Sequence, residues 1–220
     1  MKSDWSTASY WEHFYNVADT PWELGQPSPV LKEAVSEARA LGAALHGASV
    51  LVPGCGTGSD AAWLAEQGAS VLAVDFSPQA LERAAARRSN LSAAVAERIT
   101  LKQCDFFEEA FEGFSFLAEH TLFCAIDPGS RERYARSVAR ALVPGGYLFG
   151  NFFVMAESEI TARRSLALRD GDPRPPFVTS VSELQRLFLG FFEQLSLHPA
   201  RNPSPDRRAG IEWVGVFRRR

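Results

Sequence analysis

Val50-Leu51-Val52-Pro53-Gly54-Cys55-Gly56-Thr57-Gly58 is the stretch that decides the fold, together with Ser70-Val71-Leu72-Ala73-Val74-Asp75. An apolar run leads into three glycines at every second position, a helix-like stretch follows, and a second apolar run ends in a carboxylate. This is the layout of a βαβ nucleoside-binding unit, in which Gly54 and Gly56 let the backbone turn sharply and approach a ligand closely. Asp75 would then stand at the tip of the second strand, where its carboxylate can accept hydrogen bonds from two ribose hydroxyls.

The spacing of these glycines separates two kinds of nucleoside site. The dinucleotide fingerprint is G-x-G-x-x-G, whereas this chain carries G-x-G-x-G directly after Pro53. The spacing therefore argues against an enzyme that uses nicotinamide adenine dinucleotide (NAD). That interpretation remains as an alternative, as does a protein that binds a nucleoside without turnover.

The composition is that of an ordinary globular chain, with 46% hydrophobic and 22% charged residues among 220. The formal net charge of -3 gives no electrostatic case for nucleic acid as a main partner. No apolar run approaches the roughly 20 residues of a membrane span, and the start of the chain lacks the apolar segment of a signal peptide. We therefore expect a cytoplasmic enzyme, a monomer or small homo-oligomer, with no nucleic-acid and no membrane partner.

Neither the three cysteines nor the four histidines are arranged as ligands. The cysteines form no C-x-x-C pair, and the histidines are scattered without metal-ligand spacing. We therefore expect no disulfide framework and no metal site.

The pattern along the chain predicts one domain over residues 1–220, a doubly wound, Rossmann-like α/β fold with a seven-stranded sheet. An N-terminal lid segment (1–47), helical and aromatic, precedes a cofactor-binding core (48–220). Strands are predicted near 49–53, 70–75, 99–103, 115–119 and 147–153, and helices near 29–41, 59–67, 78–89, 130–142 and 180–189. Pro144-Gly145-Gly146 is expected to form the turn into the fifth strand. Residues 191–197 and 212–217 are expected to form an antiparallel strand pair at a sheet edge.

Polar side chains follow the third and fourth predicted strands. Asp105 can accept a hydrogen bond from an adenine amino group while Phe106 covers the base. Glu119 and His120 lie at the end of the fourth strand, where a cofactor's reactive end and an acceptor would meet. His120 can hold a carboxylate of a cofactor or handle an acceptor proton, and the alternative is a surface histidine after a strand.

Aromatic residues are concentrated in the N-terminal segment, where Trp11, Tyr15 and Trp22 precede the core. Aromatic faces attract cations, and a lid of this kind would exclude water from a reaction. Aromatic residues at helical spacing belong more often to a packed core. The residues alone therefore leave two interpretations open, a lid over the cofactor site and core packing.

The chain resembles the thiopurine S-methyltransferase-like family of class I S-adenosylmethionine-dependent methyltransferases, and within it the halide and thiol methyltransferase branch. The resemblance rests on motifs in order along nearly the whole chain: Trp11-Glu12-His13-Phe14-Tyr15, Asp19-Thr20-Pro21-Trp22-Glu23-Leu24-Gly25, Pro53-Gly54-Cys55-Gly56-Thr57-Gly58, Ala73-Val74-Asp75-Phe76-Ser77, Asp105-Phe106-Phe107, Thr121 to Pro128 with Arg131 and Tyr134, and Pro144-Gly145-Gly146. The resemblance implies S-adenosylmethionine as cofactor, contacted by Trp11, Tyr15, Trp22, Gly54, Asp75, Asp105, Phe106 and His120, and S-adenosylhomocysteine as product.

The acceptor side departs from the family pattern. Glu119 replaces the usual Asp of a D-x-T motif, His120 stands where relatives often carry Tyr or Arg, and Tyr15 stands where they often carry Trp. The loop over the acceptor reads Pro173-Arg174-Pro175-Pro176-Phe177, without the glycines of its family motif. The residues expected at the acceptor pocket are Trp22, Arg131, Tyr134 and Phe177.

The leading hypothesis is methyl transfer to a small soft nucleophile, a thiol or sulfide, with a halide as a further possibility. A thiol whose pKa is about 8.5 is already partly ionised at neutral pH, so an in-line displacement needs mainly alignment and exclusion of water. The alternative is a small-molecule O- or N-methyltransferase, which requires a base, with His120, Glu119 or Asp127 as candidates.

Overall fold

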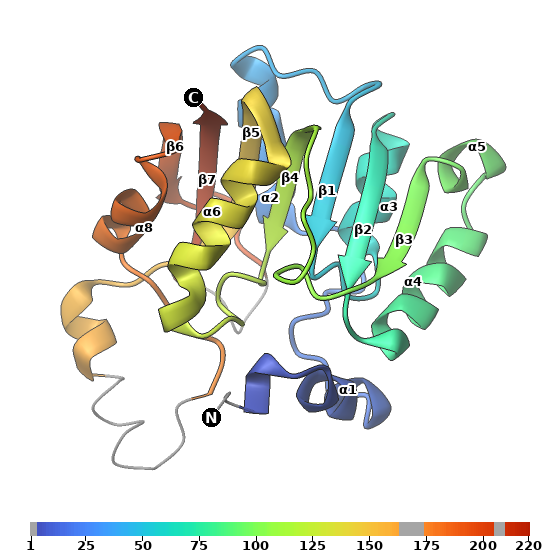
Figure 1. The fold of residues 1–220 in the computed structure, drawn as a ribbon, viewed down its shortest axis with the longest axis horizontal. Helices are drawn as coiled ribbons and strands as arrows, with labels where there is room; N and C mark the ends of the chain where they lie inside the picture. Colours follow the sequence, from blue (N-terminus) through green and yellow to red (C-terminus); the bar gives the residue numbers. More distant parts are fainter. Residues whose placement is uncertain (1–3, 163–173, 205–209) are drawn as a thin grey trace.

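The structure is a computed structural model that describes residues 4–162, 174–204 and 210–220. Within them the chain forms a seven-stranded sheet with helices on both faces (Figure 1). The strands are β1 (Ser49–Pro53), β2 (Ser70–Asp75), β3 (Ile99–Gln103), β4 (Phe114–His120), β5 (Leu142–Phe153), β6 (Phe192–Pro199) and β7 (Glu212–Arg219). The helices are α1 (Ala8–Asn16), α2 (Pro29–Ala40), α3 (Ser59–Glu66), α4 (Pro78–Ser89), α5 (Ala93–Ala96), α6 (Arg131–Ala141) and α8 (Val181–Phe188), with short 3-10 turns η1 (Asp4–Ser6) and η2 (Pro128–Ser130).

The strand order in the sheet is β3-β2-β1-β4-β5-β7-β6. The first five strands in this order pair in parallel, and β7 runs antiparallel to both β5 and β6. The order reverses between β1 and β4, and open α/β sheets bind ligands beyond the carboxyl ends of the strands at such a switch point. The prediction of a doubly wound sheet with an antiparallel C-terminal pair is confirmed, with β6 as the edge strand.

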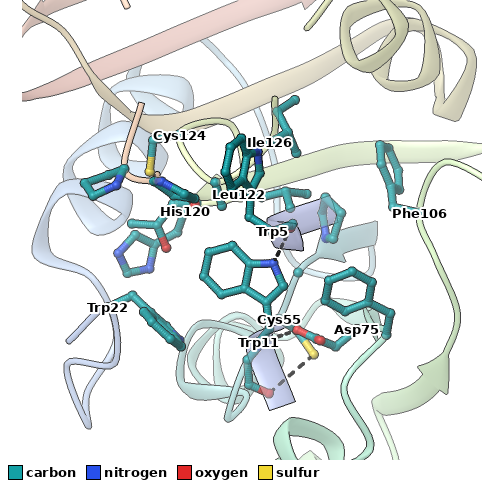
Figure 2. Close-up of a pocket in the computed structure, with 18 of the residues that line it drawn as sticks. Trp5, Trp11, Trp22, Cys55, Asp75, Phe106, His120, Leu122, Cys124 and Ile126 are labelled. Atoms are coloured by element: carbon teal, nitrogen blue, oxygen red, sulfur yellow. Dashed lines mark hydrogen bonds between the residues drawn. The ribbon is translucent and has the colours of Figure 1, made fainter. Parts of the chain in front are cut away.

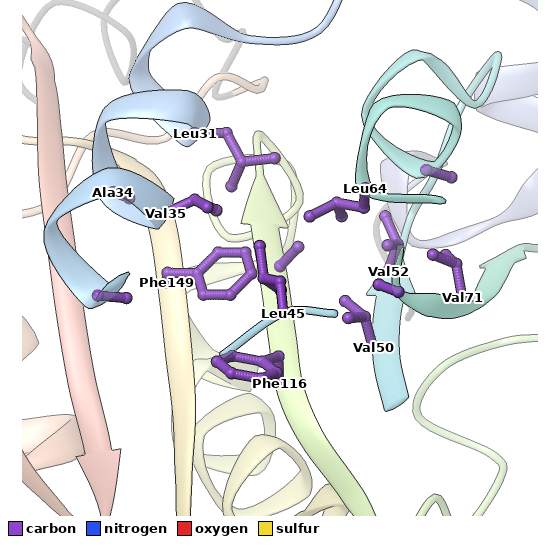
Figure 3. Close-up of a cluster of buried hydrophobic side chains, with 14 of the residues drawn as sticks. Leu31, Ala34, Val35, Leu45, Val50, Val52, Leu64, Val71, Phe116 and Phe149 are labelled. Carbon is purple, nitrogen blue, oxygen red and sulfur yellow. The ribbon is translucent and has the colours of Figure 1, made fainter. Parts of the chain in front are cut away.

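Both faces of the sheet are apolar because alternate residues of a strand point to opposite faces. In β1, Val50 and Val52 pack with α2 and α3 in one buried cluster, whose side chains Figure 3 shows. Leu51, between them, packs in a second cluster with α6 and α8 on the opposite face. A continuous run of β-branched and aliphatic residues, such as the one in β1, therefore forms a central strand whose two faces are covered by helices.

Two of the helices begin at a Ser-Pro pair. The Ser28 hydroxyl accepts a hydrogen bond from the N–H of Leu31 at 3.2 Å, and the Ser77 hydroxyl accepts one from Ala80 at 3.1 Å. The prolines that follow occupy the first helical turn, where the N–H they lack has no partner within the helix. These caps place the starts of α2 and α4 beside the carboxyl ends of the strands.

The segment Pro144-Gly145-Gly146 corrects one prediction. The sequence places a turn here, with the fifth strand starting at 147, whereas β5 begins at Leu142. The pairing moves from Leu142 opposite Phe114 to Tyr147 opposite Phe116, so the glycines form a bulge within one strand. A Cβ on Gly146 would lie 3.0 Å from the backbone oxygen of Ser115, which explains why a residue without a side chain fits. The other predicted strands and helices overlap those observed, and the short α5 has no counterpart in the sequence prediction.

The N-terminal segment divides into two parts. Figure 1 shows α1 beyond the arrowheads of β1 and β2, at the edge where the switch point lies. By contrast, α2 packs against the sheet through buried residues such as Leu31 and Val35, so among residues 4–47 it is the part before α2 that lies over the strand ends. None of the helices in the described residues is both long and apolar enough to cross a membrane.

Candidate active site

A cavity of about 830 Å³ opens at the carboxyl ends of β1, β2 and β4 (Figure 2). Its walls come from the glycine loop after β1, the tips of β2 and β3, the loop after β4, and the N-terminal segment before α2. Its volume lies in the range of about 300–1,000 Å³ that small-molecule sites occupy. Of the residues predicted for the site, the cavity is lined by Trp11, Tyr15, Trp22, Gly54, Gly56, Asp75, Asp105, Phe106 and His120.

Asp75 lies at the tip of β2, and its carboxylate binds the backbone of the glycine loop and of the residue that caps α4. Oδ2 accepts a hydrogen bond from the N–H of Gly56 and Oδ1 accepts one from Ser77, each at 2.9 Å. Burial raises the pKa of this carboxyl, although the two backbone N–H groups oppose the shift. Each carboxylate oxygen can accept a second hydrogen bond, so Asp75 can still receive hydroxyl groups of a ligand in the cavity.

The glycine loop leaves no room for side chains. Gly54 has a φ of +61°, and a Cβ there would lie 3.1 Å from Leu122 Cδ1. Gly56 has a φ of +53°, and a Cβ there would lie 2.3 Å from Glu23 Oε1. The positive φ favours glycine at both positions, and a Cβ would press on the Leu122 side chain at Gly54 and displace the Glu23 carboxylate at Gly56.

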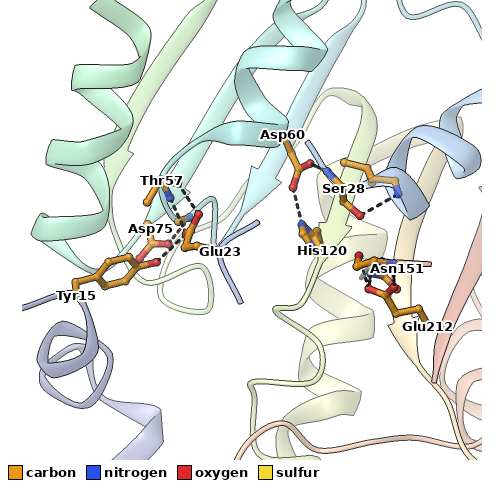
Figure 4. A network of polar contacts seen from close by, with 12 residues as sticks. Tyr15, Glu23, Ser28, Thr57, Asp60, Asp75, His120, Asn151 and Glu212 are labelled. Carbon is orange, nitrogen blue, oxygen red and sulfur yellow. Dashed lines mark hydrogen bonds and ion pairs between the residues drawn. The ribbon is translucent and has the colours of Figure 1, made fainter. Parts of the chain in front are cut away.

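Glu23 is a cavity residue that the sequence analysis does not single out. Its Oε1 accepts a hydrogen bond from the N–H of Thr57 at 3.0 Å, and its Oε2 accepts one from the Thr57 hydroxyl at 2.5 Å (Figure 4). A carboxylate of the N-terminal segment thus lies directly on the glycine loop. The sequence signal for Glu23 is its place in the motif around Trp22, whereas the contact itself joins residues far apart in the chain.

The N-terminal aromatics form one packed cluster over the cavity. The Trp22 ring meets the rings of Trp11 and Phe14 edge-on, with centroids 5.2 and 5.5 Å apart. Trp22 Nε1 donates a hydrogen bond to the Tyr15 hydroxyl at 3.1 Å. Tyr15 is buried, and burial together with the Glu23 carboxylate raises the pKa of its hydroxyl. These side chains therefore pack against one another and also line the cavity.

Two polar contacts hold this aromatic cluster to α4. The Ser77 hydroxyl, which caps α4, donates a hydrogen bond to Glu12 Oε2 at 2.5 Å. Arg83 Nη2 donates to the backbone oxygen of Tyr15 at 2.5 Å, and the guanidinium lies 5.5 Å from the centroid of the Tyr15 ring. The orientation of α1 is therefore fixed by the same helix whose start adjoins Asp75.

Asp105 and Phe106 lie where the sequence predicts, at the cavity wall after β3. Asp105 Oδ1 accepts a hydrogen bond from the N–H of Phe107 at 2.8 Å, which shapes this loop. Phe106 is largely buried and its ring stacks on that of Phe111, with centroids 5.8 Å apart. One edge of the cavity is thus a fixed aromatic surface beside a carboxylate.

His120 and Asp60 form a pair on the opposite side of the cavity. His120 Nδ1 lies 2.7 Å from Asp60 Oδ2, and Asp60 Oδ1 accepts a hydrogen bond from the N–H of Ser28 at 2.8 Å. Both side chains line the cavity and are largely buried, with exposed fractions of 12% and 13%. Asp60 is a second site residue that the sequence analysis misses, because its partner lies 60 positions away.

The chain turns sharply directly after His120. Thr121 has a φ of +65°, a region that β-branched residues rarely adopt, and strained residues of this kind cluster at functional sites. The turn places Leu122 against Gly54, across the cavity floor. Cys124 and Ile126 of the same loop continue the apolar wall.

Glu119 and Tyr134 lie outside the cavity lining. The Tyr134 hydroxyl donates a hydrogen bond to Glu119 Oε2, and the N–H of Phe123 donates to Oε1 at 2.9 Å. Both side chains are completely buried, and burial raises the pKa of Glu119 to about 7. The reason is the strand period: Glu119 and His120 are neighbours on β4, so their side chains point to opposite faces of the sheet.

Arg131 and Phe177 also lie outside the cavity lining. The Arg131 guanidinium donates to the backbone oxygen of Phe177 at 2.7 Å and to Glu183 Oε2 at 2.8 Å, and only 1% of the residue is exposed. The Phe177 ring packs against Trp5, with centroids 5.6 Å apart. The cavity is instead lined by Arg174, Pro175 and Pro176, while Pro173 lies outside the described residues. Arg131 thus holds the segment that borders the cavity.

A cluster of possible metal ligands lies away from the cavity, where α2 meets β6. The ligand atoms of Glu33, Glu37 and His198 lie within 4.8 Å of one another. Arg201 Nη1 lies 3.0 Å from Glu37 Oε1, and the Ser196 hydroxyl donates to Glu37 Oε2 at 2.7 Å. His198 Nε2 also lies 2.9 Å from Glu37 Oε1, so the cluster joins α2 to β6 as an ion-pair network.

The family model and the curated relatives identify one family, and solved structures share the fold. A family model described as thiopurine S-methyltransferase matches residues 6–215. The chain is similar to probable thiol methyltransferase 2 of Arabidopsis thaliana, with 33% identity over 211 residues that cover 95% of this chain and 84% of that protein. It is also similar to thiocyanate methyltransferase 1 of Brassica oleracea, with 30% identity over 213 residues and the same shares of both chains. Among solved structures, Burkholderia thailandensis 1,6-didemethyltoxoflavin-N1-methyltransferase has a TM-score of 0.70 at 20% identity, covering 96% of this chain and 86% of that one.

Proposed function

The chain belongs to the thiopurine S-methyltransferase family, and from this we infer that it transfers a methyl group from S-adenosylmethionine to a small thiol-type acceptor. The observation that carries the inference is the cavity in which the glycine loop, the Asp75 carboxylate and an aromatic cluster meet. The family identification agrees with the resemblance that the sequence motifs indicate.

The cavity residues fit the cofactor in three respects. Gly54 and Gly56 bring bare backbone to the cavity, Asp75 offers carboxylate oxygens beside it, and the buried Ser59 hydroxyl lines it without a partner among the described residues. We assign Asp75 to the ribose hydroxyls, Asp105 to the adenine amino group and Phe106 to the face of the base. Ser59 offers a hydrogen bond to the methionine end, near the start of α3.

The aromatic cluster suits the charge of this cofactor. When bound, S-adenosylmethionine supplies an activated methyl group on a positively charged sulfonium sulfur. Trp11, Tyr15 and Trp22 present ring faces and edges to the cavity from one packed unit, and each ring face attracts a cation by about 0.5–2 kcal/mol. The same unit covers the strand ends and keeps water from the reacting atoms.

A soft acceptor is consistent with the apolar wall of the cavity. Leu122, Cys124 and Ile126 lie along this wall, where alignment of the nucleophile with the methyl group would supply most of the acceleration. The relatives named as thiol and thiocyanate methyltransferases support sulfur acceptors, and a halide needs the same geometry. That the acceptor is a small molecule and that the enzyme is a monomer or small homo-oligomer remain predictions.

Methylation at oxygen or nitrogen is the second candidate, and one observation favours it: the contact between Asp60 and His120 at the cavity wall. Glu119, another predicted base, points to the opposite face of the sheet and does not line the cavity. Asp127, the third candidate, does line it, and its Oδ1 accepts a hydrogen bond from the N–H of Gly129 at 2.7 Å. A base for such a reaction is therefore sought at His120 or Asp127.

Cofactor choice is tested by titrating the protein's tryptophan fluorescence. Saturable quenching with S-adenosylhomocysteine and none with NADH is expected, because Trp11 and Trp22 line the cavity. Saturation with NADH alone would overturn the proposal and restore the dinucleotide interpretation.

A further inference from the structure

The pair formed by Asp60 and His120 has the geometry of an oriented imidazole. Asp60 is the second residue of α3, where the helix end stabilises a negative charge, and its other oxygen is held by the N–H of Ser28. His120 is the last residue of β4 and is paired with Asn151 of β5. Asp60 is thus held by its place in α3 and by the N–H of Ser28, and His120 is held by its place in the sheet (Figure 4).

The contact determines which nitrogen can exchange a proton with a ligand. The ionised Asp60 carboxylate can only accept hydrogen bonds, so Nδ1 of His120 carries the hydrogen in their 2.7 Å contact. A neutral imidazole held in this tautomer presents Nε2 as its basic nitrogen. Because the His120 side chain lines the cavity, proton exchange with a bound acceptor passes through Nε2.

Several ionisable groups lie on the elements packed against His120. They are Asp60 of α3, Glu119 one position earlier on β4, and Glu212 of β7, which bonds Asn151 at 2.7 Å. All three are carboxyl groups. Of these, Asp60 is the carboxylate in direct contact with the imidazole, at 2.7 Å.

We propose that Asp60 is a positioning residue that makes His120 the general base for a protic acceptor, and that the acceptor is a thiol that is mainly protonated at neutral pH. This proposal rests on the proposed function. Nε2 takes the proton of the S–H group, and the sulfur electron pair forms a bond to the methyl carbon. The bond between that carbon and the sulfonium sulfur breaks, and its electron pair stays on the cofactor sulfur. The products are the methyl thioether, neutral S-adenosylhomocysteine and a proton on His120, which then leaves to solvent.

The size of the effect follows from the acidity of the acceptor. A thiol with a pKa of about 8.5 is only a few per cent ionised at pH 7. A base that removes the need for prior ionisation therefore gains about 30-fold at pH 7, and the gain disappears as the pH rises past the acceptor's own pKa. An aryl thiol with a nitro substituent, fully ionised at pH 7, gains nothing.

The test compares kcat/KM for an aliphatic thiol and for the ionised nitroaryl thiol, at pH 7 and pH 9, in the wild type and in His120→Gln and Asp60→Asn. The amide introduced by Asp60→Asn can still accept from the N–H of Ser28, but its NH₂ group donates to Nδ1 and so forces the wrong tautomer on His120. Glu66→Gln, at the exposed end of the same helix, is the matched control. Titration with S-adenosylhomocysteine checks cofactor binding in every variant.

In both variants the loss of kcat/KM at pH 7 should be about 30-fold larger on the aliphatic thiol than on the ionised thiol, and this difference should shrink toward pH 9. Equal losses on both acceptors, or a loss that does not change with pH, would overturn the proposal that His120 acts as a general base. The contact between Asp60 and His120 would then be structural. If the wild type methylates neither thiol, the proposed function fails before any variant is compared. Should a variant not fold, the ¹⁵N spectrum of the wild-type His120 ring decides: a proton on Nε2 rather than Nδ1 overturns the proposal.

Discussion

The backbone N–H of Gly56 donates a hydrogen bond to Asp75 Oδ2, with 2.9 Å between nitrogen and oxygen. The contact joins the glycine loop after β1 to the tip of β2, at the edge of the sheet where the cavity opens. Asp75 therefore shapes the loop that approaches the cofactor and also offers the acceptor oxygens for its ribose. A substitution of Asp75 therefore affects both the shape of the loop and the binding of the ribose, and separate measurements of stability and affinity are needed to distinguish the two effects.

Replacing Asp75 with alanine should weaken binding of S-adenosylhomocysteine by about 1–3 kcal/mol, which is roughly 5- to 150-fold in Kd, through the lost ribose acceptor. Fluorescence titration measures the affinity, and urea unfolding shows how much of the loss comes from the loop. Glu97→Ala, an exposed carboxylate before β3, should leave the affinity unchanged. Wild-type affinity in Asp75→Ala would mean that the ribose does not bind at the tip of β2.

Gly56→Ala should destabilise the protein by about 1–3 kcal/mol, because φ is positive at this position and the new Cβ would lie 2.3 Å from Glu23 Oε1. Combining it with Glu23→Ala removes the collision but not the backbone strain. Urea unfolding of the two single variants and the double variant should therefore show a favourable coupling. Strict additivity would show that Glu23 does not lie on the glycine loop.

Trp22→Leu should reduce the preference for the cationic cofactor over its neutral product. S-adenosylmethionine carries the sulfonium charge and S-adenosylhomocysteine does not, so the ratio of their affinities should fall by a factor corresponding to about 0.5–2 kcal/mol. Isothermal titration with both ligands gives this ratio. Trp63→Leu, whose ring packs beside Lys32 away from the cavity, is the control, and an unchanged ratio in Trp22→Leu would remove the aromatic cluster from cation recognition.

Local patterns in the sequence predict the parts of the fold and the site that depend on neighbouring residues. The glycine loop, Asp75 and the aromatic run around Trp22 are each visible as short motifs, and the strand period places them at one edge of the sheet. Asp60 and Glu23 are not predictable in this way, because their partners His120 and Thr57 lie 60 and 34 positions away.

Two errors of placement have simple physical causes. Strand alternation alone shows that Glu119 and His120 cannot both face the cavity, yet the sequence analysis treats both as candidate bases. Arg131 and Tyr134 are placed at the acceptor because they follow the fourth strand. In the structure they turn inward from α6, to the Phe177 backbone and to Glu119 respectively. A charged or hydroxylated side chain in the interior needs such partners, and these partners are not adjacent in sequence.

The buried carboxyl of Glu119 predicts a pH dependence of stability. Burial raises its pKa from 4.5 to about 7 in the folded protein, so the folded state binds the proton more tightly than the unfolded chain does. Its contribution to the free energy of unfolding is full below about pH 4.5 and is lost as the pH rises through 7. Glu119→Gln carries no titrating group at this position. The stability of the wild type relative to this variant should therefore fall between pH 5 and pH 8 in urea unfolding, and a constant difference would contradict the burial of an ionisable carboxyl.

The central claim is methyl transfer to a soft nucleophile, and an assay with labelled S-adenosylmethionine tests it most directly. The acceptors are iodide, bisulfide, an aromatic thiol, a thiopurine, a catechol and an amine, and transfer of the label is measured for each. The account predicts turnover confined to the sulfur acceptors and iodide. Turnover only on the catechol or the amine would contradict it: the fold and the cofactor would stand, and the enzyme would be an O- or N-methyltransferase.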